Sequence, residues 1–168
     1  MPAAYSDQTT VIGQTGYAAF DIQRVPLALT DGWNVFHHLS NGIVANRCDI
    51  TLRDCSFHYI EPDAMYNDLD GNGAAIHARA THGWHTLDQV GSFVNGVLPF
   101  RECHWGVYAK RMNVYSSLNT MDQVGTAYHI EKGGSRDVHI HTNNLDTKYD
   151  GIELLFNDEA AQLLIEGN

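Results

Sequence analysis

Oxygen-bearing side chains alternate over residues 68–73, which read Asp68-Leu69-Asp70-Gly71-Asn72-Gly73. Alternating Asp and Asn oxygens of this kind converge on one cation in the first half of calcium-binding loops. The twelfth position of such a loop is Arg79 instead of glutamate, so a complete EF-hand-type loop is excluded. Turns rich in Asp, Gly and Asn also form without a metal. Asp68, Asp70 and Asn72 are therefore the candidate Ca²⁺ ligands, and Ca²⁺ is the one cofactor that the sequence suggests.

The ten histidines offer a second kind of metal ligand. His139 and His141 are two residues apart in an alternating segment, so they lie on the same face of a strand and could share a transition metal. Exposed histidines on a hydrated sheet are the simpler interpretation, and we favour it.

A third group of residues suits a carbohydrate ligand, because aromatic rings stack on sugars and charged groups bind acidic ones. The candidate ligand-binding residues are Trp84, Tyr108, Lys110, His77 and His129, and the candidate catalytic residues are Lys110, Arg111 and Glu153. A polysaccharide lyase needs a base near the sugar C5 proton and a cation that neutralises the uronate. Base candidates are present, but the neighbouring positions hold no cluster of three carboxylates that would bind such a cation.

A glycoside hydrolase would need two carboxylates about 5–9.5 Å apart. Asp150 and Glu153 are close enough in sequence to share the end of one strand. Asp150 is explained more simply as a turn residue, so this pair gives hydrolysis only weak support.

The elements that would position these residues follow a repeat. An eight-residue frame has an aliphatic first residue, Asn or Cys in sixth place and an apolar residue in eighth place. Its sixth place is occupied by Asn34, Cys55, Asn95, Asn119, Asn143 and Asn168, with spacings of 21, 40, 24, 24 and 25 residues. Stacked asparagine amides can bond to one another and to the backbone of a buried corner. The frame therefore predicts an asparagine ladder.

A second frame consists of a glycine and the short alternating segment that follows it. It begins at Gly16, Gly42, Gly73, Gly106, Gly125 and Gly151. We expect these glycines at tight corners that need a positive φ, and we expect every second residue after them to face outward. Counting from glycine predicts two outward columns, one of Asn46, His77, Lys110, His129 and Leu155, the other of Val44, Ala75, Tyr108, Ala127 and Glu153.

A repeat of about 24 residues is too short for a βαβ unit of roughly 30 residues, but it holds three short strands and three turns. The frames therefore predict an all-β fold, a right-handed parallel β-helix of about six coils. Residues 1–15 are expected as a lead-in and residues 16–168 as the solenoid, with an insertion at about 58–88. The last ladder position has no capping element after it, so we expect a fragment of a longer solenoid.

The composition and net charge of the chain exclude some classes of binding partner. Its 168 residues include 20 acidic and 10 basic ones, for a net charge of −10, which argues against nucleic acid and anionic membranes as partners. No apolar run approaches the roughly 20 residues that span a bilayer, and the first residues do not resemble a signal peptide. Three cysteines cannot form a complete disulfide framework, and we interpret Cys55 as structural. Cys48 and Cys103 could pair only if the inserted segment folds back, and free thiols are the simpler interpretation.

Residues 42–57 combine both frames and read Gly-Ile-x-Ala, then Ile-x-Leu-x-x-Cys-x-Phe. This pattern resembles the right-handed β-helix repeats of the pectate-lyase-like superfamily. It is most similar to the β-helical stretches of large secreted or surface proteins of Bacteroidota-type bacteria that are exported by the type IX system. The resemblance covers about residues 16–168 and implies the fold. It implies no single activity, because the same coils carry lyases, hydrolases, phage tailspikes and adhesins.

We therefore expect a non-catalytic, secreted or cell-surface module that serves as a rigid stalk or adhesin and binds a polysaccharide or surface glycan. Further solenoid coils or a secretion or surface complex are the other expected partners, and neither nucleic acid nor membrane insertion is expected. A polysaccharide lyase or glycoside hydrolase that acts on an acidic polysaccharide is the first alternative. A phage tailspike fragment, which would form a stable trimer, is the second.

Overall fold

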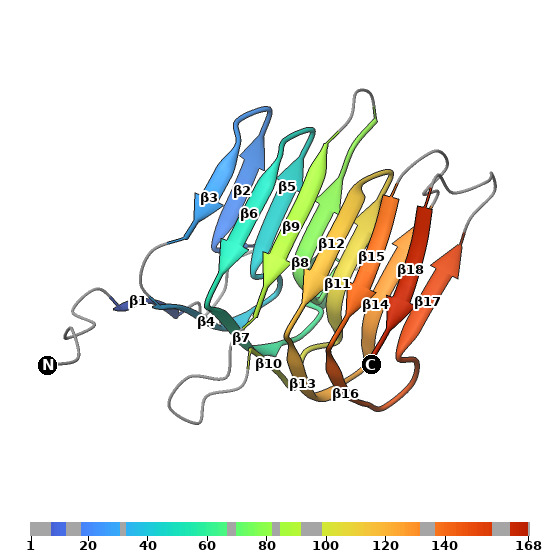
Figure 1. Cartoon of the computed structure of the whole chain (residues 1–168). Helices are drawn as coiled ribbons and strands as arrows, with labels where there is room; N and C mark the ends of the chain where they lie inside the picture. Colours follow the sequence, from blue (N-terminus) through green and yellow to red (C-terminus); the bar gives the residue numbers. More distant parts are fainter. Residues whose placement is uncertain are drawn as a thin grey trace, which may run out of the picture.

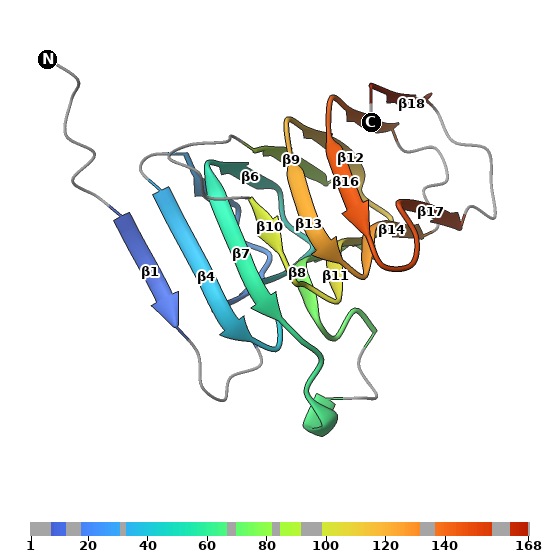
Figure 2. The same cartoon turned by 90° about the horizontal axis from the view of Figure 1, so that it is seen from below.

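The chain winds through three parallel β-sheets around one core, as the computed structural model shows (Figures 1 and 2). The structure describes residues 8–12, 18–30, 33–66, 70–81, 85–91, 99–131, 137–155 and 162–167. We call the three sheets A, B and C, and their strands are given below. Each turn of the chain passes through sheet B, then sheet C, then sheet A. The predicted all-β parallel β-helix is confirmed, with about five turns instead of six. The prediction equated six ladder positions with six coils. Six successive positions are separated by only five turns of the chain.

The strands of each sheet are short and pair in parallel. Sheet A contains β1 (Gln8–Ile12), β4 (Trp33–Leu39), β7 (Cys55–Ile60), β10 (Phe100–Arg101), β13 (Thr120–Val124) and β16 (Asn144–Thr147). Sheet B contains β2 (Phe20–Gln23), β5 (Ile43–Asn46), β8 (Ala74–Arg79), β11 (Trp105–Lys110), β14 (Thr126–Glu131) and β17 (Ile152–Leu155). Sheet C contains β3 (Leu27–Leu29), β6 (Ile50–Arg53), β9 (Thr86–Val90), β12 (Asn113–Ser117), β15 (Asp137–His141) and β18 (Gln162–Glu166).

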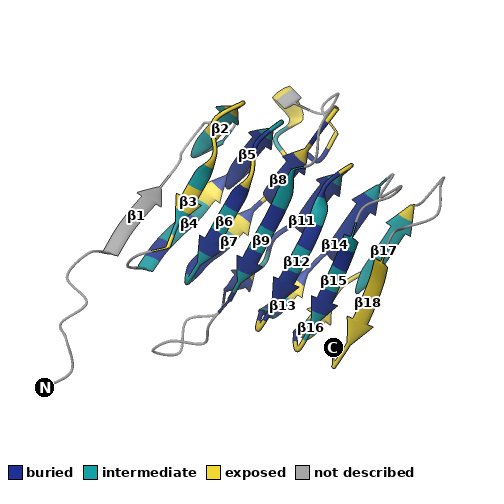
Figure 3. Cartoon of the chain, turned by 45° about the horizontal axis from the view of Figure 1, so that its top comes forward, coloured by how far each residue is buried: buried dark blue, intermediate teal, exposed yellow. Residues whose placement is uncertain are grey.

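Apolar side chains of like kind stack along the solenoid axis and form the core. In sheet A, the ring of Phe57 lies between those of Phe36 and Phe100, with centroids 5.0 and 5.3 Å apart. Ile76 and Val107 form a similar column in sheet B, and both are fully buried. The central strands carry most of the buried residues (Figure 3). Alternating sequence thus places one face of strands such as β6, β9 and β15 in the core, as expected from a period of two.

The predicted insertion at about residues 58–88 is smaller than expected, because strands of the coil occupy part of it. Residues 58–60 extend β7, and residues 74–79 form β8, so both belong to the coil. The described residues that leave the coil are 61–66 and 70–73, and the first group includes the 3₁₀ helix η1 (Ala64–Tyr66) at the end of β7 (Figure 2). The lead-in also differs from expectation, because Gln8–Ile12 forms β1 and pairs with β4.

The asparagine ladder lies at the corner from sheet C to sheet A. Asn34 pairs with Cys55 across β4 and β7, and Asn119 donates a hydrogen bond from Nδ2 to Asn143 Oδ1 over 2.9 Å. The Asn119 backbone amide donates to the same oxygen over 3.0 Å. The residue before three of these positions has a positive φ, at Asp54, Leu118 and Thr142. A left-handed residue turns the chain sharply, and the buried amide then satisfies the corner backbone.

Two copies of the ladder frame are out of register with the rest. Ile50 pairs with Leu87 instead of Val90, and Phe57 pairs with Phe100 instead of Val97. Asn95, like Asn168, lies outside the described residues, but this pairing contradicts the frame that placed it in the ladder. The connection from β9 to β10 is longer than the frame allows, and a local pattern does not detect such a length change. In the first coil, likewise, Leu27 and not Leu29 pairs with Ile50.

A buried polar cluster extends the ladder into the core. Gln89 and Asn119 exchange two side-chain hydrogen bonds, of 2.5 and 2.7 Å. The Ser116 hydroxyl donates to Gln89 over 2.6 Å, and the Tyr128 hydroxyl donates to Asn143 Oδ1 over 3.2 Å. These partners explain how amide and phenol groups are accommodated without exposure. The cysteines are buried and free, and burial raises the pKa of Cys55 and of Cys103 to about 12.

The glycine frame is correct in three coils and shifted in the others. The pairing of sheet B aligns one column of small residues: Ala19, Gly42, Ala75, Gly106, Ala127 and Gly151. Gly16, Gly73 and Gly125 are therefore two or three residues too early. The expected reason was also wrong for Gly42 and Gly106, which do not have a positive φ. A Cβ on Gly42 would collide with the Ala75 carbonyl oxygen, so close approach between coils is what requires a small residue.

Candidate functional site

Titratable side chains gather on the outward side of sheet B. One outward column consists of Val44, His77, Tyr108, His129 and Glu153. A second column, two residues further along each strand, consists of Asn46, Arg79, Lys110, Glu131 and Leu155. Parallel pairing spaces neighbouring members of a column by about 4.8 Å, so side chains from successive coils reach one another.

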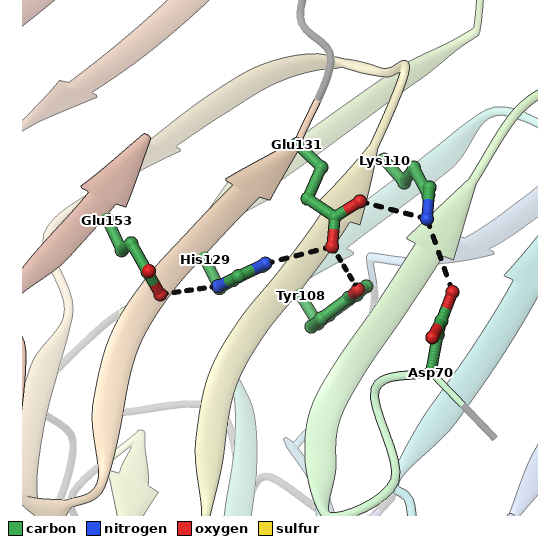
Figure 4. A network of polar contacts seen from close by, with 6 residues as sticks. All are labelled: Asp70, Tyr108, Lys110, His129, Glu131 and Glu153. Carbon is green, nitrogen blue, oxygen red and sulfur yellow. Dashed lines mark hydrogen bonds and ion pairs between the residues drawn. The ribbon is translucent and has the colours of Figure 1, made fainter. Parts of the chain in front are cut away.

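Glu131, on β14, is the centre of a polar network on this face (Figure 4). One of its carboxylate oxygens accepts a hydrogen bond from the Tyr108 hydroxyl over 2.5 Å and lies 3.1 Å from His129 Nε2. The other oxygen lies 2.8 Å from the Lys110 ammonium nitrogen. Three neighbouring groups thus meet one carboxylate.

The network ends on an acidic residue at each side (Figure 4). His129 Nδ1 lies 2.6 Å from Glu153 Oε2, on the next coil. The Lys110 ammonium donates to Asp70 Oδ2 over 3.2 Å, and Asp70 comes from the inserted segment. The network therefore ties the insertion to three successive strands of sheet B.

The network determines which groups are charged. Burial by itself would raise the pKa of Glu131, but hydrogen bonds from Lys110, Tyr108 and His129 outweigh it and lower the pKa to about 2. The hydrogen bond to Glu131 raises the pKa of Lys110, and burial together with the same carboxylate raises the pKa of Tyr108. At neutral pH Lys110 and Tyr108 are therefore protonated, and neither is poised to act as a base.

The aromatic groups of this face are packed against one another. The rings of Tyr108 and His129 are stacked with centroids 4.6 Å apart, and Trp105 meets His129 edge-on at 5.1 Å. Tyr108 and His129 are buried, being 5% and 7% exposed. Their ring faces are therefore occupied, and they do not form the open platform on which a sugar would stack.

His77 is enclosed between sheet B and the inserted segment. It is 1% exposed, and a Cβ on Gly71 would lie 3.0 Å from its Nδ1. Neither ring nitrogen has a hydrogen-bond partner among the residues that the structure describes. Burial, with the charges of Arg79 and Lys110, lowers the pKa of His77 to about 4. His77 is therefore neutral at pH 7 and is not available to a ligand.

A basic pocket lies where the strands of sheet B end and the chain turns toward sheet C. Its volume is about 420 Å³, within the range of small-ligand sites. Its lining residues are Asn46, Arg47, Asp70, Arg79, Ala80, Thr81, Lys110 and Arg111. Four of the ten basic residues of the chain are thus collected here. None of the three arginines forms an ion pair with any residue in the described part of the chain.

The structure brings together most of the predicted site residues. Lys110 and Arg111 line the basic pocket, while Glu153 contacts His129. Trp84 lies outside the described residues. Sequence reasoning missed Arg79 and Glu131, because counting from Gly73 and Gly125 aligned the wrong neighbours in successive coils. It missed Arg47 because this residue follows β5 and lies beyond the strand positions that were counted. Ala75 and Ala127, expected to face outward, instead lie in the column of small residues.

Of the three predicted Ca²⁺ ligands, the structure describes two, and both contact other parts of the protein. Asp68 lies outside the described residues, and Asp70 pairs with Lys110. Asn72 hydrogen-bonds the backbone of Asp63 through both its amide oxygen and its amide nitrogen. In the residues described, no group of three or more His, Cys, Asp or Glu side chains is arranged to hold a metal ion. The pair of His139 and His141 is on the outward face of sheet C, as predicted, with His139 next to Tyr115.

Comparisons with known proteins found no matching family model, no matching curated protein and no matching solved structure. Within the described ranges, no helix has the length and apolar character needed to cross a membrane.

Proposed function

We propose that the chain is a non-catalytic β-helix module of a secreted or cell-surface protein, which serves as a rigid stalk or adhesin and binds a glycan at the edge of sheet B. The observation that carries this proposal is the closed network on the outward face. Lys110, the predicted base, is held between Glu131 and Asp70 at 2.8 and 3.2 Å. A base must be free to accept a proton near neutral pH, and these contacts favour the protonated form.

The basic pocket supports binding without catalysis. Its arginines have no acidic partner among the described residues, so their charge is available to a ligand. The stacked sheets support the scaffold role, since parallel pairing and a continuous core resist bending. The net charge of −10 keeps such a surface soluble and disfavours nucleic acid as the partner.

The proposal extends to relationship and origin. We infer membership of the pectate-lyase-like superfamily and export by a type IX system in a Bacteroidota-type bacterium. The pattern of residues 42–57 and the parallel β-helix support this relationship. Recognition of the polysaccharide or surface glycan would then be one task of a surface-exposed module.

The test measures binding and turnover with one panel of acidic and neutral polysaccharides. We expect retention in affinity electrophoresis for at least one glycan, with no release of reducing ends or unsaturated uronates. Product release that Lys110→Ala abolishes would overturn the non-catalytic assignment and establish the lyase alternative. Absence of binding across the whole panel would contradict glycan recognition itself.

A further inference from the structure

The basic pocket differs in charge from the rest of this acidic protein. It lies on three successive coils, with Arg47 following β5, Arg79 ending β8 and Arg111 following β11. Arg79 and Lys110 are direct neighbours in the register. Four cations and a single described carboxylate, that of Asp70, line about 420 Å³. An excess of positive charge in one concave site favours an anionic occupant.

The backbone of the pocket is fixed, so its arginine side chains are presented from a rigid frame. Arg47 and Arg111 both have a φ of 58° and occupy equivalent corner positions. The Arg47 amide donates to the Arg79 carbonyl over 2.8 Å, and the Arg111 amide donates to the Glu131 carbonyl over 3.0 Å. Guanidinium groups held at adjacent positions can bind one oxyanion through paired N–H donors, or two neighbouring ones.

Two buried polar atoms at the pocket lack a hydrogen-bond partner among the described residues. Asn46 Oδ1, an acceptor, and Arg47 Nε, a donor, are buried without a partner among the described residues. A side-chain rotation that brings Arg47 to a ligand oxygen would gain a hydrogen bond without breaking one at Nε. An acceptor such as Asn46 Oδ1 suits a hydroxyl group. The pair therefore matches a ligand that carries both anionic oxygens and hydroxyls.

The ion pair between Asp70 and Lys110 indicates where a bound anion would lie. The Asp70 carboxylate reaches Lys110 from the inserted segment, and 65% of the Asp70 side chain is exposed. An exposed ion pair contributes little and exchanges readily with competing ions. The Asp70 carboxylate therefore occupies a position that a ligand carboxylate or sulfate could take.

From this arrangement we propose that the pocket is an anion subsite for the carboxylate or sulfate-ester groups of a hydroxylated ligand, and that Asp70 is a built-in competitor for Lys110. The ligand being a glycan rests on the function proposed above. The anion subsite itself rests on the pocket alone. Carboxylate and sulfate ester are two sources of the same chemistry, and the probes below distinguish them.

The experiment compares the 168-residue chain with three variants, using calorimetry at low salt. The probes are inorganic sulfate and two matched pairs of polymers: dextran sulfate against dextran, and polygalacturonate against its methyl ester. We expect binding of at least one charged member of a pair and much weaker binding of its neutral counterpart, with affinity falling as NaCl is raised. Arg47→Gln should weaken the charged probe about tenfold or more. Asp70→Asn should strengthen it several-fold, since the competing carboxylate is removed.

Arg101→Gln is the matched control. Arg101 pairs with Glu102 and Asp122 on sheet A, so this variant removes the same charge outside the pocket. An equal loss of affinity in Arg101→Gln and Arg47→Gln would overturn the subsite, because only net charge would then matter. If Arg47→Gln does not fold, as judged by circular dichroism, Arg79→Gln replaces it, since Arg79 is exposed.

The two proposals fail in different ways. Equal binding of charged and neutral probes would overturn the anion subsite and leave glycan recognition standing. Binding of inorganic sulfate that Arg47→Gln abolishes, with no polysaccharide bound, would support the subsite and overturn glycan recognition. Absence of binding by sulfate and by both charged polymers would overturn the subsite.

Discussion

Asn143 is a shared hydrogen-bond acceptor at the ladder corner. Its side-chain oxygen accepts hydrogen bonds from the backbone and side chain of Asn119 and from the Tyr128 hydroxyl. We expect Asn143→Ala to lower the free energy of unfolding by about 2–3 kcal/mol, because buried donors lose their acceptor. Chemical denaturation measures the change. Asn144→Ala next to it, at an exposed position, should be nearly neutral, and equal effects would contradict the ladder.

His77 should make stability depend on pH in a defined window. Its pKa is lowered to about 4 in the folded chain, against 6.5 when unfolded, because it is buried. Between these values the unfolded chain binds more protons, so stability is complete above pH 6.5 and falls as the pH drops toward 4. The loss is on the order of 3 kcal/mol, from about 1.4 kcal/mol for each pH unit. Denaturation curves from pH 7 to 4 measure it.

His77→Phe should remove that loss, since phenylalanine fills the site without titrating. A second decline, between pH 4.5 and about 2, belongs to Glu131 and should remain in the variant. The Glu131 pKa is depressed by folding, so its contribution is present above pH 4.5 and disappears as the carboxylate is protonated. An unchanged slope between pH 6.5 and 4 in His77→Phe would show that His77 is not buried as described.

At the scale of the elements, the column of small residues in sheet B controls how closely the coils approach. A Cβ on Gly106 would lie 2.5 Å from the Ala127 carbonyl oxygen and 3.0 Å from Met121 Sδ. At Gly151 the nearest such atom is 3.9 Å away, and neither glycine has a positive φ. Gly106→Ala should therefore destabilise by about 1–3 kcal/mol, whereas Gly151→Ala should be neutral or slightly stabilising. Thermal unfolding of both variants tests this, and a tolerated Gly106→Ala would refute the close approach.

The strands themselves were largely predictable, but their partners were not. Period-two alternation identifies the outward position of His77 and His129 correctly, because a shift of two residues leaves the facing of a strand unchanged. The same shift changes which residue lies beside it in the next coil. Counting from Gly73 and Gly125 therefore aligned Ala75 with Tyr108, whereas the pairing aligns His77 with Tyr108.

At the scale of the whole molecule, stability should decrease from the central coils toward the outer ones. Strands β11 and β12 each pair with a neighbour on both sides, whereas β17 and β18 pair on one side and β18 is exposed throughout. Because a solenoid is held by contacts between adjacent coils, we expect backbone amides of residues 105–117 to exchange much more slowly than those of 162–166. Hydrogen–deuterium exchange with mass spectrometry measures this. Uniform exchange would indicate that the solenoid opens as one unit.

The sequence by itself determined the fold class, because its causes are local. Alternation within a strand, an asparagine at a corner and a coil of about 24 residues are each read within a single turn, and together they predict a parallel β-helix. The tertiary structure decided the register, since the segments between β7 and β8 and between β9 and β10 change the coil length without altering the pattern around them. Register in turn created the functional surface. Glu131 meets Lys110, and Arg47 and Arg79 line one pocket, only because different turns of the chain stack in that alignment.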